Sequence, residues 1–238
     1  AKYINSPETP LFSKSSMLYG LDTARDVMAK SRRAVVVEGY TDCLAARQVG
    51  IGDVVAVLGT ITLFTGTMQA LKQEQSKRLL AFHSIGQIGY ILLGTGACMS
   101  LLPALGPNAA ALAAIGFFGA LLHVLNHGLF KALLFFNAGS MLHATGTQDL
   151  NKMGGLMKFM PLTAITAIVA SFCISGVPLF NGFVSKWTIY VAAVQGSGSA
   201  KYLAVFAVIA ILTSALTLAS FIKFFGVSFL SRTSALVT

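Results

Sequence analysis

The chain has 238 residues, of which 55% are apolar and only 11% are charged. A soluble globular domain carries about twice that share of charge, so these values exclude an ordinary soluble protein. The formal charge of +9 does not indicate nucleic-acid binding either, because most of it belongs to basic residues that lie between long hydrophobic runs, a pattern typical of membrane proteins.

Charge divides the chain into two parts. Residues 1–53 contain seven Lys or Arg and six Asp or Glu, whereas residues 54–238 contain ten Lys or Arg and only two acids, Glu74 and Asp149. The three cysteines are far apart and indicate neither a disulfide framework nor a zinc site. We therefore expect a short soluble segment followed by a membrane domain.

The first part is predicted to be a short α/β segment. Helical patterns at residues 22–30 and 41–49 flank a β-branched run at residues 34–37, and such a unit is too small to close its own core. The run delivers Glu38 to its carboxyl end, and Asp42 follows a tight turn. Carboxylates in this arrangement can hold a divalent metal for phosphoryl transfer; a solvated Glu at a strand end is the alternative.

From residue 54 the apolar runs are long enough to cross a bilayer, which takes about 20 helical residues. The sequence predicts about five membrane helices, over residues 54–71, 79–102, 109–143, 161–195 and 202–230. Two of them run to about 35 residues, or roughly 50 Å, so tilt, protrusion or a break is expected. The predicted fold class is a mainly α, polytopic membrane helix bundle preceded by the incomplete α/β segment.

The fourth predicted helix carries such a break. Gly176, Pro178 and Gly182 lie in the middle of its apolar run. Pro178 has no amide hydrogen and clashes with the preceding turn. A bilayer tolerates this where protein or a water-filled cavity satisfies the freed backbone groups, which indicates an ion or substrate site; a packing kink is the alternative.

The loop charges predict the orientation of the helices. Basic residues gather between the first and second helices, between the third and fourth, and after the fifth: Lys72, Lys77, Arg78, Lys152, Lys158 and Arg232. The positive-inside rule places these segments in the cytoplasm. Lys201, in the connection between the fourth and fifth helices, departs from this pattern.

Three titratable side chains form a row on the third predicted helix. His123, His127 and Lys131 are spaced by four residues, so they share an arc of roughly 80° along roughly 12 Å of the axis. Charge at membrane depth is costly and is usually retained where it faces a wet interior, so the row is a candidate proton relay. Two alternatives remain: buried histidines that only form hydrogen bonds, and a Lys131 that snorkels to an interface.

Further relay candidates lie on the second and fourth predicted helices. Lys186 follows Gly182 by four residues, where burial and a helix dipole both disfavour its ammonium form; the alternative is a helix-end lysine that reaches headgroups beside Trp187 and Tyr190 as interfacial anchors. Lys77 begins the second helix and serves most simply as a topology signal. His83 either extends a proton path toward the cytoplasm or only hydrogen-bonds its neighbour Ser84. On the fifth helix, Lys223 is expected to snorkel.

Residues 1 to about 60 resemble the first half of the Toprim catalytic core of bacterial DNA primases. The similar segments are residues 2–12 (KYINSPETPLF), 18–21 (LYGL), 37–42 (VEGYTD) and 56–60 (AVLGT). This resemblance implies that Glu38 is the catalytic and metal-binding acid, that Asp42 lies beside the metal, and that Mg²⁺ is a possible cofactor. The later Asp-x-Asp motif of that family is missing, so primer synthesis is not expected.

Residues from about 57 to 238 resemble the second half of an antiporter-like subunit of the complex I, Mrp antiporter and membrane-bound hydrogenase group. The similar segments are residues 58–62 (LGTIT), 69–72 (QALK), 77–85 (KRLLAFHSI), 123–140 and 176–186 (GVPLFNGFVSK). The resemblance implies that His127 and Lys131 belong to a central hydrophilic axis and that Lys186 is the terminal lysine on a discontinuous helix. His83 after Phe82, and Trp187 after Lys186, favour the formate hydrogenlyase-type members.

This second resemblance implies proton or cation translocation in the inner membrane of a bacterium. The implied partners are the lipid bilayer and the other membrane and redox subunits of a respiratory or hydrogenase complex. No nucleic acid is expected for the membrane part, and no cofactor is expected in the chain apart from the possible Mg²⁺. The family's first inverted repeat is absent from this sequence.

The two resemblances meet at residues 58–60 (LGT), a tripeptide that both families offer. We therefore expect a chimera, with a primase-like part at residues 1–57 and a membrane part at residues 58–238. Two other functions stay open: a DNA primase fragment to which the membrane part is joined artefactually, and a non-conducting structural subunit fragment.

Overall fold

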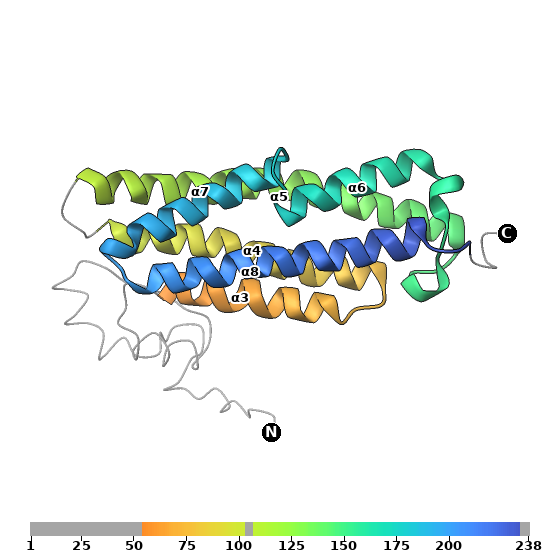
Figure 1. Ribbon diagram of the computed structural model, residues 1–238, viewed down its shortest axis with the longest axis horizontal. Helices are drawn as coiled ribbons and strands as arrows, with labels where there is room; N and C mark the ends of the chain where they lie inside the picture. Colours follow the sequence, from red (N-terminus) through yellow and green to blue (C-terminus); the bar gives the residue numbers. More distant parts are fainter. Residues whose placement is uncertain (1–53, 103–106, 234–238) are drawn as a thin grey trace, which may run out of the picture. The chain divides into compact units, whose positions relative to one another are not determined.

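The computed structural model describes residues 54–102 and 107–233. The predicted α/β segment, including Glu38 and Asp42, lies outside this part of the chain. The main helices of the described part run side by side as a bundle (Figure 1). They are α3 (Val54–Leu71), α4 (Ser76–Leu101), α5 (Pro107–Thr145), α6 (Pro161–Ser175), α7 (Asn181–Gln195) and α8 (Tyr202–Phe225). A π-helical segment, Gly226–Leu230, extends α8.

The prediction of a mainly α, polytopic membrane bundle is confirmed. Within the described residues, α3, α4, α5 and the α8 segment through Leu230 are long and apolar enough to cross a membrane. The fourth predicted helix is divided into α6 and α7, of 15 residues each. By contrast, α5 runs without a break for 39 residues, or about 58 Å, so its excess length is met by tilt or protrusion.

Local chemistry explains where the broken helix ends and restarts. Pro161 occupies the first turn of α6, where its missing amide hydrogen costs nothing. Gly176 ends α6 in the left-handed conformation, with φ 76°, which a residue without a side chain adopts at little cost. Five residues later α7 begins at Asn181, so the two half-helices form one interrupted span.

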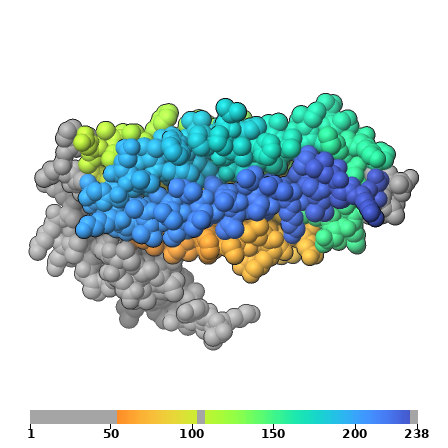
Figure 2. Space-filling view, viewed as in Figure 1, coloured from red at the N-terminus to blue at the C-terminus, as the bar shows by residue number. Residues whose placement is uncertain are grey.

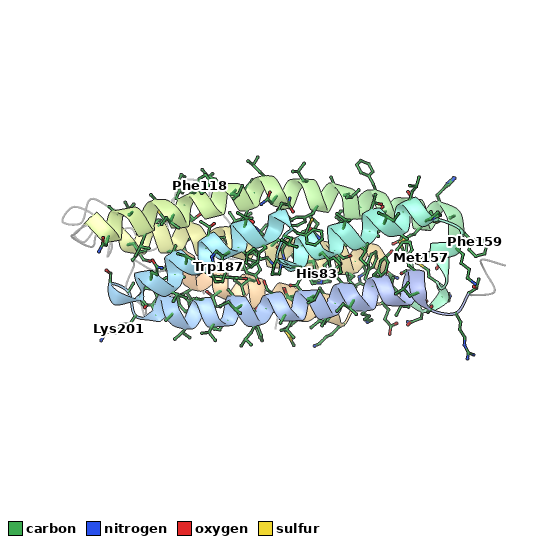
Figure 3. All side chains as sticks on the ribbon, turned by 45° about the horizontal axis from the view of Figure 1, so that its top comes forward. His83, Phe118, Met157, Phe159, Trp187 and Lys201 are labelled. Carbon is green, nitrogen blue, oxygen red and sulfur yellow. The ribbon has the colours of Figure 1, made fainter. Side chains whose placement is uncertain are left out.

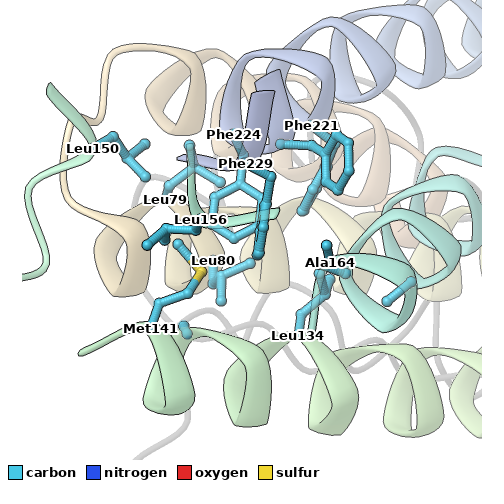
Figure 4. Packing of buried hydrophobic residues seen from close by; sticks show 14 of the residues in the cluster. Leu79, Leu80, Leu134, Met141, Leu150, Leu156, Ala164, Phe221, Phe224 and Phe229 are labelled. Atoms are coloured by element: carbon cyan, nitrogen blue, oxygen red, sulfur yellow. The ribbon is translucent and has the colours of Figure 1, made fainter. Parts of the chain in front are cut away.

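Two apolar clusters fill the interior. The first contains Leu79, Leu80, Phe221, Phe224 and Phe229 among others (Figure 4). The second contains Leu93, Ala113, Ile189, Leu203 and Ala207 among others. Along α4, α5 and α8 most of the buried side chains between these clusters are polar.

We call this intermediate layer the polar belt. It consists of His83, Gln87, His123, Asn126, Ser185, Lys186, Thr213, Ser214, Thr217 and Ser220, most of them buried. Figure 3 shows His83 inside the bundle, away from both of its ends. Polar and charged groups therefore lie at mid-depth, where a membrane offers them no solvent.

One end of the bundle carries most of the charge. The backbone of the α3–α4 loop pairs with the segment after α5, since Ser76 N donates to Gln148 O at 2.9 Å and Leu150 N donates to Glu74 O at 2.8 Å. We call this the basic end, because six basic residues of the loops, helix starts and chain segments there all belong to it: Lys72, Lys77, Arg78, Lys152, Lys158 and Arg232. The opposite end holds Lys201 as its one Lys, Arg, Asp or Glu within the described ranges (Figure 3). The fold thus brings together the loops that the positive-inside rule assigned to one side.

Candidate functional site

Lys186 lies in the first turns of α7, directly behind the break, and is almost fully buried, with 1% of its surface exposed. Its Nζ donates to the carbonyl oxygen of Ile174 at 2.9 Å and to Oγ of Ser214 at 3.1 Å. The same nitrogen lies 4.3 Å from the centre of the Tyr90 ring. The alternative of a lysine that reaches lipid headgroups is therefore wrong.

The break gives Lys186 both a hydrogen-bond acceptor and the space for its side chain. The amide of Gly176 bonds to the carbonyls of Phe172 and Cys173, and the carbonyl of Ile174, in the last turn of α6, accepts from the lysine instead. A Cβ on Gly176 would lie only 3.0 Å from Cδ of Lys186. The left-handed glycine thus makes room for the lysine side chain.

Hydroxyl groups continue from Lys186 into α4 and α8. Oγ of Ser214 lies 3.0 Å from the hydroxyl of Tyr90 and 2.8 Å from that of Tyr190. Tyr90 also donates to the carbonyl of Ala210 at 2.7 Å. Tyr190 is therefore an interior residue and not an interfacial anchor, whereas Trp187 is 55% exposed and stacks on Phe183.

His123 occupies the centre of the polar belt and is fully buried. Its Nδ1 lies 2.8 Å from Oγ of Ser185, and its Nε2 donates to Oε1 of Gln87 at 3.1 Å. Since an amide oxygen only accepts, Nε2 carries a proton when the ring is neutral. Asn126 holds this group against the start of α7, donating to the carbonyl of Asn181 at 2.8 Å.

Lys131 and His83 form a second group nearer the basic end. Lys131 is buried, with 6% of its surface exposed, and its Nζ donates to the carbonyl oxygen of Leu80 on α4. This contact excludes the alternative that Lys131 snorkels. His83 lies one turn further along α4 and bonds through Nε2 to Ser220 Oγ at 2.8 Å, so the alternative in which it only hydrogen-bonds Ser84 is wrong. Ser84 bonds instead to Leu80.

The two groups meet on one face of α4. His83 and Gln87 are four residues apart, so they lie one turn from each other. Within the described residues, His83 Nδ1, Gln87 Nε2 and His127 Nε2 are buried without a protein partner. Buried polar groups of this kind are normally satisfied by ordered water, so the atoms of His83 and Gln87 mark where the belt is suited to hydration, and the His127 atom marks such a place outside the belt.

Other predicted residues lie away from the belt. His127 is only half-buried and meets the Phe130 ring edge-on, so the row on α5 is not equally deep. Lys77 lies in the first turn of α4 among the loops of the basic end, about 9 Å along the helix from His83. Lys223 is half-buried and points its Nζ toward the basic end, at the carbonyls of Leu71 and Gln73, at 3.5 and 3.4 Å.

Several residues of the polar belt were not predicted from the sequence. Ser214 and Ser220 sit on the very apolar α8, and Gln87 and Ser185 look unremarkable in their own segments. One signal was available, because Gln87 follows His83 by one helical turn. Ser185, Ser214 and Ser220 could be identified only from the folded structure, because their hydrogen-bond partners lie on other segments of the chain.

Two family models match different parts of the chain. The model described as NADH:quinone oxidoreductase/Mrp antiporter, TM, matches residues 40–217. The model of the DNA primase catalytic core, N-terminal domain, matches residues 1–25. The first match begins ahead of residues 58–60, so the position of the expected junction stays a prediction.

Individual relatives agree with the larger match. Formate hydrogenlyase subunit 3 of Escherichia coli (strain K12) is 40% identical over 184 residues, covering 75% of this chain and 30% of that protein. Hydrogenase-4 component B of the same organism is 37% identical over 188 residues, covering 75% and 27%. Among solved structures, the Mrp complex from Dietzia sp. DQ12-45-1b matches with a TM-score of 0.65 and 30% identity over 76% of this chain and 30% of that chain. The chain thus spans less than a third of these relatives' length.

Proposed function

We propose, from the premise that this chain belongs to the NADH:quinone oxidoreductase/Mrp antiporter membrane family, that it carries protons, or another cation, through the interior of a multi-pass membrane subunit. One observation carries this proposal. A lysine sits fully buried at the break of an apolar helix, and hydroxyl groups join it to α8 and α4. A charge at that depth is costly to keep unless the protein uses it.

The proposed path uses groups that both donate and accept protons. Lys186 exchanges a proton with Ser214, whose hydroxyl can reverse direction, and the tyrosine hydroxyls can do the same. His123 takes up a proton at Nδ1 from the side of Ser185 and releases one at Nε2 toward Gln87. Water at the unpaired nitrogens of Gln87 and His83 would carry the proton on toward Lys131 and the basic end.

The relatives support a more specific parent complex. Two of them are named as a formate hydrogenlyase subunit and a hydrogenase-4 component. We infer that this chain works in a hydrogenase-type complex of a bacterial inner membrane, beside further membrane subunits and redox subunits that supply the driving reaction.

Proton flux into liposomes tests the function directly. The full chain is reconstituted with a pH-sensitive dye inside the vesicles and driven by a potassium-diffusion potential. We expect flux above that of empty liposomes, and at least a tenfold loss in Lys186→Ala, because a positioned proton carrier is typically worth about 10²–10⁴ in rate.

Lys201→Ala is the matched control, since it removes an exposed lysine at the end of the bundle and should conduct like the unsubstituted chain. Equal flux in the Lys186→Ala and unsubstituted chains would refute the proposed role of Lys186. Flux no higher than in empty liposomes would refute conduction by this chain.

A second origin is proposed for the start of the chain, because residues 1–25 match a primase domain. We infer that a primase-type sequence has been joined to the membrane subunit, and that any binding of Mg²⁺ by Glu38 is a remnant of that origin. Sequencing reads of source DNA that run continuously from the codon of residue 25 to that of residue 62 would show that one gene encodes both parts. Reads that end within this interval would show two separate genes.

A further inference from the structure

A groove opens at the basic end of the bundle, apart from the polar belt. It has a volume of about 720 Å³ and lies between two segments that are distant in sequence, near residues 155–158 and 229–233. In Figure 2 the green segment ahead of α6 and the dark blue end of α8 adjoin at this end of the bundle. None of the proton-carrying candidates lines this groove.

Packed residues of the bundle hold the two walls of the groove in place. Phe229 lies on one side of it and Leu156 beside it, and both are buried in the first apolar cluster together with Met153. The backbone of Gly155 comes so close to Thr233 that a Cβ would lie 2.7 Å from the threonine Oγ1. The two walls are thus fixed against each other by packing.

The polar lining of the groove is suited to an anion. Lys158 lies on one wall and Arg232 on the other, and both side chains are exposed. No Asp or Glu is among the residues that line it. The lining also includes the hydroxyl residues Ser231 and Thr233. Two cations facing one space without a carboxylate between them favour a phosphate.

Apolar side chains flank the same two cations. Met157 is 46% exposed, Phe159 56% and Leu230 61%. Figure 3 shows Met157 and Phe159 at the end of the bundle opposite Lys201. These residues lie where α6 begins and the α8 segment ends, so they sit at the boundary between hydrocarbon and headgroups.

We propose that this groove binds the headgroup of an anionic phospholipid, with the phosphate held by Lys158 and Arg232. The acyl chains then run along Met157, Phe159 and Leu230 on the outside of the bundle. A lipid is the occupant that matches both halves of the surface, because it brings an anion and hydrocarbon chains to this depth. The proposal needs only the multi-pass fold and not proton transport.

Native mass spectrometry of the full chain in neutral detergent tests this proposal. The probes are phosphatidylglycerol, which is anionic, and phosphatidylcholine, which is not. We expect a clear preference for phosphatidylglycerol, and a loss of about thirtyfold in its binding in the double variant Lys158→Gln/Arg232→Gln, since each of the two cations near an anionic lipid surface contributes about 1 kcal/mol.

Two control variants separate the groove from general charge. Lys72→Gln/Arg78→Gln removes the same charge from the same end but outside the groove, and should bind as the unsubstituted chain does. Lys158→Arg/Arg232→Lys keeps the charge and should retain the lipid. Excess inorganic phosphate should not displace the lipid, because it lacks the acyl chains.

Three results would overturn the proposal. One is equal binding of the two lipids, which would mean that the groove does not select an anionic headgroup and would favour a protein subunit as its occupant. Another is unchanged phosphatidylglycerol binding in Lys158→Gln/Arg232→Gln. The third is full displacement by inorganic phosphate, which would make the groove a site for a free anion. None of these results bears on proton flux, so this proposal and the proposed transport function fail independently.

Discussion

Ser214, which the sequence did not single out, joins three buried polar groups. Its Oγ lies within hydrogen-bond distance of the Lys186 amine and of two tyrosine hydroxyls, at 2.8–3.1 Å. A single hydroxyl therefore coordinates three groups from two helices, α4 and α7. In an apolar interior, the loss of a hydrogen-bond partner by any of these groups lowers the stability of the fold.

We predict that Ser214→Ala lowers both stability and proton flux. The substitution leaves Lys186 with the Ile174 carbonyl as its remaining hydrogen-bond acceptor, and an unsatisfied buried polar group costs about 1–3 kcal/mol. The thermal midpoint of the full chain in detergent, followed by circular dichroism, should fall. The matched control is Ser197→Ala, at an exposed position, and should leave the midpoint unchanged.

An unchanged midpoint and an unchanged flux in Ser214→Ala would mean that the hydroxyl is not part of the path. A lower midpoint with normal flux would assign it a structural role only.

At the scale of the helices, α3 and α4 touch through their backbones. Gly89 of α4 lies against Gly59 and Leu63 of α3, so closely that an added Cβ would lie 2.6 Å from the Gly59 carbonyl oxygen. Small residues permit this approach between membrane helices, where van der Waals contact drives association. The contact fixes the rotation of α4, and with it the direction of His83 and Gln87.

Gly89→Ala is therefore expected to destabilise the bundle. The methyl group meets backbone atoms, which cannot move aside as a side-chain tip can, so a loss of about 1–3 kcal/mol follows. Gly139→Ala is the control on α5, because an added Cβ there meets nothing within 4 Å. The midpoint should fall for Gly89→Ala and stay or rise slightly for Gly139→Ala; the same midpoint in both would contradict the close contact.

The helices themselves could be predicted well from the sequence. The boundaries of α3 agree with residues 54–71, and the break between α6 and α7 falls where Gly176, Pro178 and Gly182 lie. Hydropathy, proline and glycine act locally, so a single sequence reveals them. Helix α4 begins at Ser76, three residues earlier than expected. This start depends on the segment after α5, because the amide of Ser76 donates a hydrogen bond to the carbonyl of Gln148 there.

The contacts between helices were not predictable in the same way. His83 pairs with Ser220, which is 137 residues away, and Lys186 with Ser214. These pairs depend on how each helix is rotated and packed, and helical spacing within one segment does not contain that information. The titratable residues could be found from their cost in an apolar run, but their hydroxyl and amide partners required the fold.

At the scale of the described bundle, the polar belt separates two apolar clusters along three helices. The two buried lysines lie at different places in this arrangement. Lys186 is at the break and Lys131 is nearer the basic end, with His123, Gln87 and His83 between them. If protons use this belt, the two lysines act in series on one path and not as two separate routes.

Proton flux in a double-variant series tests that claim most directly. The unsubstituted chain, Lys131→Ala, Lys186→Ala and the double variant are reconstituted at equal protein-to-lipid ratios, with Lys201→Ala as the control. One path in series predicts that each single variant loses most of the flux and that the double variant loses no more than the more impaired single variant. Single variants that conduct normally, or a double variant whose loss is the product of two partial losses, would contradict a continuous path through the belt.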